Sequence, residues 1–203
     1  AIARALAMNP KVLMMDEPLA NLDTKLRGEM RRFIRNLQQR LGITTIFVTH
    51  DQIEAMELAD RVAVIFDGNL AQYDAPDALY KRPNSIEIAD FMGATNVFDA
   101  AIKGKTATAS FGTLAFETDA TDGPAHVMLR GEAIDLHLAA PSGAQNTIAG
   151  TVTAREFFGA NITYTVDCSG AQIQVIEQSR RMIDLDQQVW LTIPPDRIWI
   201  IQT

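Results

Sequence analysis

Three side chains suited to acid–base or metal chemistry follow two short apolar segments. Asp16 and Glu17 come directly after the apolar run at residues 12–15, and His50 follows the β-branched run at 44–49. Carboxylates at the carboxyl end of a parallel strand lie where such sheets bind their ligands. Adjacent residues of a strand point to opposite faces, so the two carboxylates would do different jobs. One could hold Mg²⁺, and the other could act as general base toward water.

Each of these residues also has a structural interpretation. The dipeptide Asp16-Glu17 can be a polar strand exit, with Pro18 ending the strand. A lone histidine such as His50 is more often structural than catalytic. Its place at the same sheet edge as Asp16 favours a hydrogen bond to a phosphoryl oxygen, which would stabilise charge during transfer.

Two further acidic residues stand where helices are expected to begin. Asp51 is expected to cap the helix that follows His50. Asp23 opens a long helix and is either its N-cap or a contact across a subunit interface, and the local sequence does not separate these two roles.

The elements that must position these residues alternate in the first half. Strands are expected at 11–16 and 44–49 with a helix at 24–41 between them, the pattern of a βαβ unit in a parallel sheet. The first strand is continuously apolar, as in a strand covered on both faces. Gly42 would end the helix. One helix face carries the apolar residues Leu26, Met30, Phe33, Ile34, Leu37 and Leu41.

Shorter elements are expected around this unit. Residues 1–8 indicate the end of a helix, and residues 61–73 a hairpin that turns at Asp67-Gly68-Asn69. Two short helices should follow, the second capped by Asn84 and closed by Gly93.

After Gly93 the pattern changes to short alternating segments separated by Gly, Pro, Asp and Ser, which predicts a small all-β barrel or sandwich. The sequence therefore predicts two domains, residues 1–93 and 94–203. The Gly104–Thr106 tripeptide GKT looks like the end of a phosphate-binding loop. That motif needs a glycine where Asp99 stands, so a turn is expected instead.

Composition excludes several classes of protein. The net charge is -7 with no basic block, which argues against nucleic acid as a partner. The single cysteine, Cys168, allows no internal disulfide and fits a reducing cytosolic setting. No apolar run approaches the ~20 residues of a membrane-spanning helix.

Together these motifs resemble the ATP-binding subunits of ABC transporters. VLMMDEP at 12–18 is similar to Walker B with its catalytic glutamate, LANLD at 19–23 to the D-loop, and VTH at 48–50 to the H-loop. Longer runs such as THDQIEAMELADRVAVIFDG resemble the importers of sugars, polyamines, iron and related solutes. In that subgroup a β-rich regulatory region of the TOBE type follows, and the segments VMLRGEAIDL and GTVTAREFFGANITYTVD resemble its strands.

The resemblance implies an α/β first domain, with part of a P-loop NTPase-type parallel sheet, followed by an all-β OB-like barrel. It implies that Asp16 positions Mg²⁺ through water and that Glu17 is the base for the attacking water. His50 would contact the γ-phosphate of ATP, and Asp23 would act in communication between two subunits. The implied partners are a second ATPase subunit in a homodimer and transmembrane permease subunits, at the inner face of the cell membrane.

Departures from the family pattern bear on activity. Walker A, the Q-loop and the signature motif would precede residue 1, so the chain resembles the C-terminal part of such a subunit. By itself it is expected to bind MgATP poorly and to turn it over negligibly. Strands at 12–16 and 45–49 would lack sheet neighbours, which predicts disorder near the start or self-association through residues 1–50. Ala20 replaces the usual D-loop serine, and Gly131 the usual proline of the barrel motif.

A second hypothesis is a stand-alone regulatory module without ATPase activity, in which the β-rich half senses a small solute, an anion or a partner protein. An OB-type nucleic-acid binder is disfavoured, because the second half lacks a basic groove with stacking aromatics.

Overall fold

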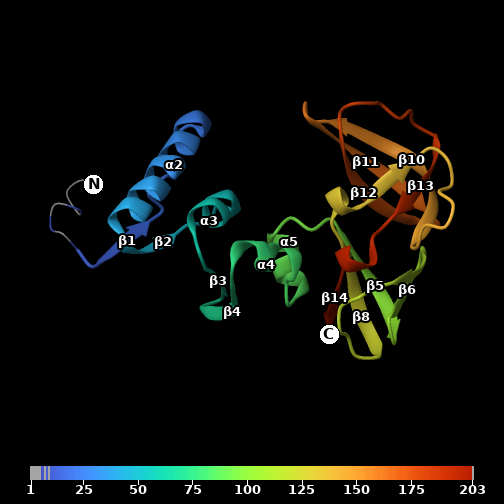
Figure 1. Cartoon of the computed structure of the whole chain (residues 1–203), viewed down its shortest axis with the longest axis horizontal. Helices are drawn as coiled ribbons and strands as arrows, with labels where there is room; N and C mark the ends of the chain where they lie inside the picture. Colours follow the sequence, from blue (N-terminus) through green and yellow to red (C-terminus); the bar gives the residue numbers. More distant parts are fainter. Residues whose placement is uncertain (1–5, 7, 9, 203) are drawn as a thin grey trace. The chain divides into compact units, whose positions relative to one another are not determined.

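A computed structural model describes residues 6, 8 and 10–202 of the chain (Figure 1). The chain divides into two compact units, Ala1–Tyr80 and Lys81–Thr203. The helix expected at 1–8 and the disorder expected near the start fall largely outside the described residues. No helix among the described residues is long and apolar enough to cross a membrane.

A βαβ unit forms the start of unit 1, as predicted. Strand β1 (Val12–Asp16) pairs in parallel with β2 (Thr44–Val48), and helix α2 (Thr24–Leu41) connects them. Alternate β1 residues, Leu13 and Met15, are buried in one cluster with α2. The period of two along the strand therefore gives this sheet one face packed against the helix.

The predicted bounds of α2 are confirmed at both ends. Asp23 accepts hydrogen bonds at its Oδ1 from the backbone N–H groups of Lys25 (3.1 Å) and Leu26 (3.0 Å). At the other end, Gly42 adopts φ 61°, a left-handed conformation that only glycine reaches without strain.

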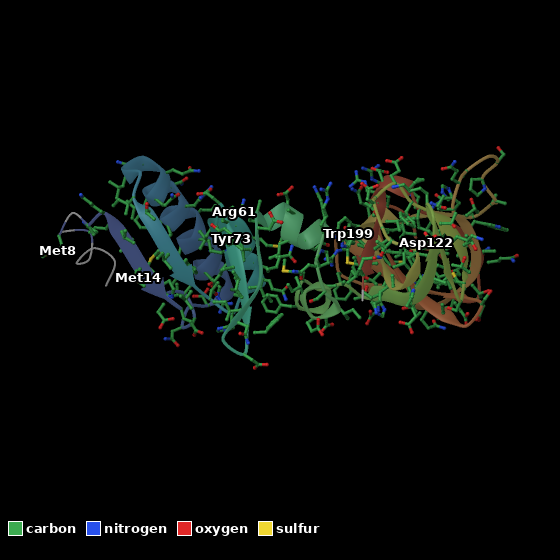
Figure 2. All side chains as sticks on the ribbon, turned by 90° about the horizontal axis from the view of Figure 1, so that it is seen from below. Met8, Met14, Arg61, Tyr73, Asp122 and Trp199 are labelled. Atoms are coloured by element: carbon green, nitrogen blue, oxygen red, sulfur yellow. The ribbon has the colours of Figure 1, made fainter. Side chains whose placement is uncertain are left out.

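The opposite face of the β1–β2 sheet is open, and the expectation that β1 is covered on both faces is wrong for the described residues. Apolar side chains on this face are 47–71 % exposed. They are Val12, Met14 (labelled in Figure 2), Ile46 and Val48. The apolar stripe of α2 is also wider than the surface that covers it, since Phe33 and Leu41 are exposed. Among the described residues β1 and β2 pair only with each other, so no further described strand extends this sheet.

Short elements complete unit 1. They are α3 (Gln52–Leu58), β3 (Val62–Phe66), β4 (Asn69–Asp74) and α4 (Pro76–Lys81), which runs to the end of the unit. The β3–β4 hairpin turns where expected, with positive φ at Asp67 and Gly68. Arg61 lies over the ring of Tyr73, 4.5 Å from its centroid (Figure 2).

Unit 2 begins with helix α5 (Ile86–Phe91), which is capped by the Ser85 hydroxyl and not by Asn84 as expected. Ala89 of this helix is buried with Met128 and Ile201 of the β-rich part. The compact units therefore part before α5, whereas the predicted domain boundary at 93–94 lies after it and stays a prediction.

A five-stranded antiparallel sheet forms the OB-like barrel that was predicted. Its edge strands approach each other, since the Leu136 N–H of β9 donates to the Glu177 carboxylate of β12 (3.3 Å). The strands in spatial order are β12 (Ala171–Gln178), β11 (Asn161–Cys168), β10 (Thr147–Phe157), β13 (Gln188–Thr192) and β9 (Asp135–His137).

A second five-stranded antiparallel sheet packs with the first in unit 2 (Figure 1). The sequence did not predict β14 (Ile198–Gln202), the last strand along the chain. Its segment IWIIQ is almost continuously apolar and shows no alternation of apolar and polar residues. The strands in spatial order are β14 (Ile198–Gln202), β8 (Gly123–Leu129), β5 (Asn96–Lys103), β6 (Thr106–Ala109) and β7 (Gly112–Ala115).

Asn96 joins the two sheets. Its buried side-chain amide donates to the Gln174 carbonyl and accepts from the Gln174 N–H, both at 2.7 Å. Gly131 lies against β12, the strand that contains Gln174. A Cβ added at Gly131 would be 3.0 Å from the backbone oxygen of Gln174. The glycine at this position therefore allows a close approach of two backbones.

The GKT tripeptide is a turn, as expected. It connects β5 to β6, and Lys105 donates to the carbonyls of Glu117 (3.0 Å) and Thr118 (2.9 Å) and to the Asp119 carboxylate (2.8 Å). The lysine ammonium thus binds its own protein.

Candidate functional site

Parallel pairing brings the predicted residues to one edge of the β1–β2 sheet. Asp16 ends β1 opposite Val48, which ends β2. The next residue, Glu17, donates its backbone N–H to the Val48 carbonyl at 2.9 Å. His50 stands two residues after Val48, so the chain leaves both strands at the same place.

Glu17 and His50 contact each other directly. Glu17 Oε1 lies 2.9 Å from His50 Nδ1, and their side chains are 48 % and 76 % exposed. The sequence indicated a common sheet edge but not this pair, because the pairing depends on the register of the two strands. A carboxylate and an imidazole in contact at an open edge can exchange a proton with each other and with a bound ligand.

The contact changes the acid–base behaviour of His50. Its hydrogen bond with Glu17 and the negative charge of that carboxylate raise the pKa of His50, and Asp51 and Glu54 add to this effect. Because the pKa is raised, more of the imidazole is protonated at neutral pH than in a free histidine. A protonated His50 suits an anionic ligand such as a phosphate.

The backbone of Glu17 is unusual. Its φ is 41°, in the left-handed region that non-glycine residues seldom adopt, and Pro18 follows it directly. Backbone outliers of this kind cost of order 1–3 kcal/mol and cluster at functional sites.

Residues that sequence reasoning missed support the His50 turn. The Thr49 hydroxyl donates to the Glu54 carboxylate (2.6 Å) and accepts from the Asp51 N–H (3.0 Å). Glu54 is only 3 % exposed, and a buried carboxylate of this kind in α3 gives no local sequence signal. Asp51 caps α3 as predicted, accepting from the N–H groups of Ile53 and Glu54.

Three arginines at four-residue intervals connect α2 to α3 and its flanks. Arg27 pairs with Asp51 (3.4 Å), and Arg31 with Glu57 (2.7 Å). Arg35 pairs with Asp60 (2.7 Å), whose pKa the guanidinium lowers. The densest basic cluster of the sequence is therefore largely used in holding the two helices together.

Asp23 and Asp16, the two remaining predicted residues, differ in their surroundings. Asp23 uses Oδ1 to cap α2, which agrees with the structural role of this residue. Asp16 presents an exposed carboxylate at the end of β1. No group of three or more metal-binding side chains occurs within the described part of the chain. Mg²⁺ does not need one, since it is commonly held by one or two carboxylates together with water and phosphate oxygens.

Comparison with known proteins places the chain. The model of the TOBE domain matches residues 127–201. The chain is 41 % identical, over 87 % of its length, to the Fe(3+) ions import ATP-binding protein FbpC 1 of Rhizobium meliloti, of which it covers 51 %. It is 39 % identical over 97 % of its length to the sulfate/thiosulfate import ATP-binding protein CysA of Burkholderia mallei, of which it covers 54 %.

A third relative is the spermidine/putrescine import ATP-binding protein PotA of Borreliella afzelii, 35 % identical over 99 % of this chain and 57 % of the relative. The chain spans about half the length of these relatives. The alignments extend over both compact units, which confirms the resemblance drawn from the first-half motifs and the β-rich second half. The homologues of this chain are thus ATP-binding subunits of importers, as the resemblance to ABC importers implies, and its β-rich half matches the TOBE domain.

Proposed function

We propose that this chain supplies part of the ATP-hydrolysing site of an ABC importer, coupling ATP binding and hydrolysis to solute uptake. One observation carries the proposal: Glu17 and His50 are in contact at 2.9 Å at the carboxyl edge of two parallel strands, next to the Asp16 carboxylate. The names of the relatives, all import ATP-binding proteins, support the same conclusion.

In this proposal Glu17 is the general base. Its carboxylate accepts a proton from the water that attacks the γ-phosphate of ATP. His50 contacts the γ-phosphate, and its protonated form offsets the negative charge of the transferring group. While no phosphate is bound, the contact with His50 holds the Glu17 carboxylate in place.

Asp16 is the residue that would hold Mg²⁺, through a bound water. An exposed single carboxylate fits this role, because the nucleotide phosphates and water supply the other oxygens. The bound ion would neutralise charge on the phosphates. Asp16 therefore contributes a ligand, while Glu17 and His50 handle the proton and the phosphate.

The proposed partners are a second ATPase subunit and permease subunits in the membrane, so that the chain works at the inner face of the cell membrane. Asp23, at the exposed start of α2, would contribute to communication between the two ATPase subunits in addition to capping its helix. The relatives are named for a metal ion, oxyanions and polyamines, so the proposal concerns solute import and no single solute.

The alternative of a stand-alone TOBE module is not favoured. Relatives match 87–99 % of the chain, so the resemblance includes the segment with Asp16, Glu17 and His50. A module that only sensed a ligand would not require these residues.

The test replaces Glu17 with glutamine in the complete ATP-binding subunit that contains this chain. Removing a general base is expected to lower ATP turnover by about 10²–10⁴-fold while MgATP binding persists. Glu57→Gln is the matched control. Like Glu17, Glu57 is a half-exposed glutamate in an ion pair, here with Arg31 at 2.7 Å, and it lies outside the site. Glu17→Gln with unchanged turnover would refute the proposal.

A second arm uses the 203-residue chain alone. It is expected to bind MgATP weakly, because its sequence contains no GxxxxGK[ST] loop to cradle the phosphates. Calorimetric titration with MgATP and a phosphate-release assay measure this. ATP turnover by the isolated chain that disappears on Glu17→Gln would contradict the expectation.

A further inference from the structure

Arg27 on α2 binds the two segments that carry Glu17 and His50. Its Nη2 donates to the Leu22 carbonyl at 3.1 Å, and its Nη1 to the Asp51 carboxylate at 3.4 Å. Leu22 belongs to the loop that runs from Glu17 to α2, and Asp51 follows His50 directly. One guanidinium therefore connects these segments independently of the β1–β2 pairing.

The first segment is compact, so its far end is coupled to Glu17. The Ala20 N–H donates to the Glu17 carbonyl (3.3 Å), and the Leu22 N–H to the Leu19 carbonyl (3.1 Å). Leu19 is 1 % exposed and anchors the loop in the core of unit 1. Moving the Leu22 carbonyl would consequently disturb a short chain of bonds that leads back to Glu17.

The second segment is fixed through Asp51. This carboxylate uses Oδ1 to cap α3 and Oδ2 to bind Arg27, while its backbone N–H donates to Thr49. His50 lies between the two residues of the Thr49–Asp51 bond. The Arg27–Asp51 contact therefore acts on a turn whose backbone, including that of His50, is already held by the Thr49–Asp51 hydrogen bond.

We propose that Arg27 is a positioning residue whose guanidinium holds the Glu17 loop against the His50 turn and keeps the two catalytic side chains in contact. Guanidinium is suited to this role because it is planar and donates to two acceptors at once, which an ammonium cannot reproduce in the same geometry. The importance of this contact for ATP hydrolysis rests on the proposed function.

The chain contains a matched control. Arg35 lies eight residues further along α2 and is also partly exposed. It too binds one backbone carbonyl, that of Leu58 (3.0 Å), and one carboxylate, that of Asp60 (2.7 Å). Both acceptors lie outside the Glu17 loop and the His50 turn. Arg35→Gln therefore removes the same kind of bridge without touching the proposed one.

The experiment follows the pKa of His50 by proton NMR in the 203-residue chain. Three histidines are present, and His50→Gln identifies the signal of interest. Arg27→Gln and Arg27→Lys are expected to lower the pKa of His50 toward that of an ordinary histidine, because the contact with Glu17 is lost. Arg35→Gln is expected to leave it unchanged.

The direction of the shift separates positioning from a simple charge effect. The acidic groups that act on His50 are Glu17, Asp51 and Glu54. If Arg27 only screened Asp51, Arg27→Gln would expose more negative charge and raise the pKa of His50, while Arg27→Lys would keep it. A raised or unchanged pKa in folded Arg27→Gln overturns the proposal. So does loss of the fold in both Arg27 variants but not in Arg35→Gln, since that would give Arg27 a general structural role.

The same variants in the complete subunit extend the test to turnover. Misplacing a catalytic group by about 1 Å can cost about 10²-fold in rate, so Arg27→Gln should lower kcat by up to that factor with little change in KM. If the pKa falls as expected but Glu17→Gln leaves ATP turnover intact, the proposed function fails and the positioning role stands. If Glu17→Gln abolishes turnover but Arg27→Gln leaves the pKa of His50 unchanged, the proposed function stands and only the positioning role of Arg27 is refuted.

Discussion

At the scale of residues, Glu17 combines two features that a strand exit does not need. Its backbone has a φ of 41° directly before a proline, and its side chain contacts His50, which follows the other strand, β2. The contact holds the Glu17 carboxylate at the edge of the sheet. Asp16, its neighbour, is still part of strand β1, so the backbone conformation changes between the two acids.

Glu17→Gln should remove a pH-dependent part of the stability of the chain. A pKa that is raised in the folded state stabilises the fold at pH values below the ordinary histidine pKa, and this contribution is lost as pH rises through the raised value. The difference in urea midpoint between wild type and Glu17→Gln should therefore be larger near about pH 6 than near about pH 9. The effect should be small, because the pair is exposed.

Glu57→Gln serves as control for this prediction. Glu57 pairs with Arg31, which stays charged at both pH values, so its effect on the urea midpoint should be the same at both. Equal differences for Glu17→Gln at the two pH values would contradict a stabilising Glu17–His50 pair.

At the scale of elements, α2 is the part that positions the site. It covers one face of the β1–β2 sheet, its N-cap residue Asp23 ends the loop from Glu17, and its arginines bind α3 and its flanks. The chain enters and leaves this helix through well-defined caps. Glu17 and His50 therefore lie directly after two strands that α2 packs against, and the loop from Glu17 to Asp23 is short.

Asp23→Ala should destabilise unit 1 by about 1 kcal/mol, because the first N–H groups of α2 lose their acceptor. Asp23→Asn keeps a capping oxygen and should lower the free energy of unfolding by no more than about a few tenths of a kcal/mol. Urea unfolding followed by far-UV circular dichroism, to which the 18-residue helix α2 contributes, measures both.

The same pair of variants separates the two roles of Asp23 in the complete subunit. If the carboxylate communicates with a second subunit, Asp23→Asn should lower ATP turnover while stability is kept. Equal destabilisation by alanine and asparagine would instead show that the negative charge of Asp23, and not its capping oxygen, stabilises α2.

At the scale of the whole molecule, each compact unit has its own buried core. The core of unit 2 draws on both of its sheets, and Asn96 binds across them through two 2.7 Å hydrogen bonds. Unit 1 leaves one face of its two-stranded sheet exposed. The two units thus differ in how completely they bury their apolar side chains.

The open face of unit 1 predicts self-association of the 203-residue chain through residues 1–50. Burying apolar side chains contributes about 25 cal/mol per Å² of area removed from water, and paired edges would satisfy backbone groups. Sedimentation equilibrium should show a concentration-dependent dimer or larger species. Met14→Glu combined with Ile46→Glu should restore a monomer.

Leu70→Glu is the control for this prediction, since Leu70 is 62 % exposed on β4, outside residues 1–50. It should leave self-association unchanged. A chain that stays monomeric at high concentration, or a Leu70 variant that dissociates as fully as the double variant, would rule out this interface.

Much of this fold was readable from the sequence because the relevant interactions are local. The bounds of α2, its cap at Asp23 and the left-handed Gly42 are set by residues within one helical turn of each other. Most strands of unit 2 follow from alternation over a few residues. Strand β14 was not predicted because its segment is apolar without alternation. The cap of α5 was predicted one residue too early because asparagine and serine, here Asn84 and Ser85, are both good N-cap residues.

The sequence by itself predicted Asp16, Glu17 and His50 as candidate site residues and predicted that they would share one sheet edge. Only the tertiary structure decided their contacts. Glu17 and His50 are 33 residues apart, Arg27 and Asp51 24, and Asn96 and Gln174 78. Such contacts depend on strand register and helix packing, which are set by burial over the whole unit and not by any local pattern.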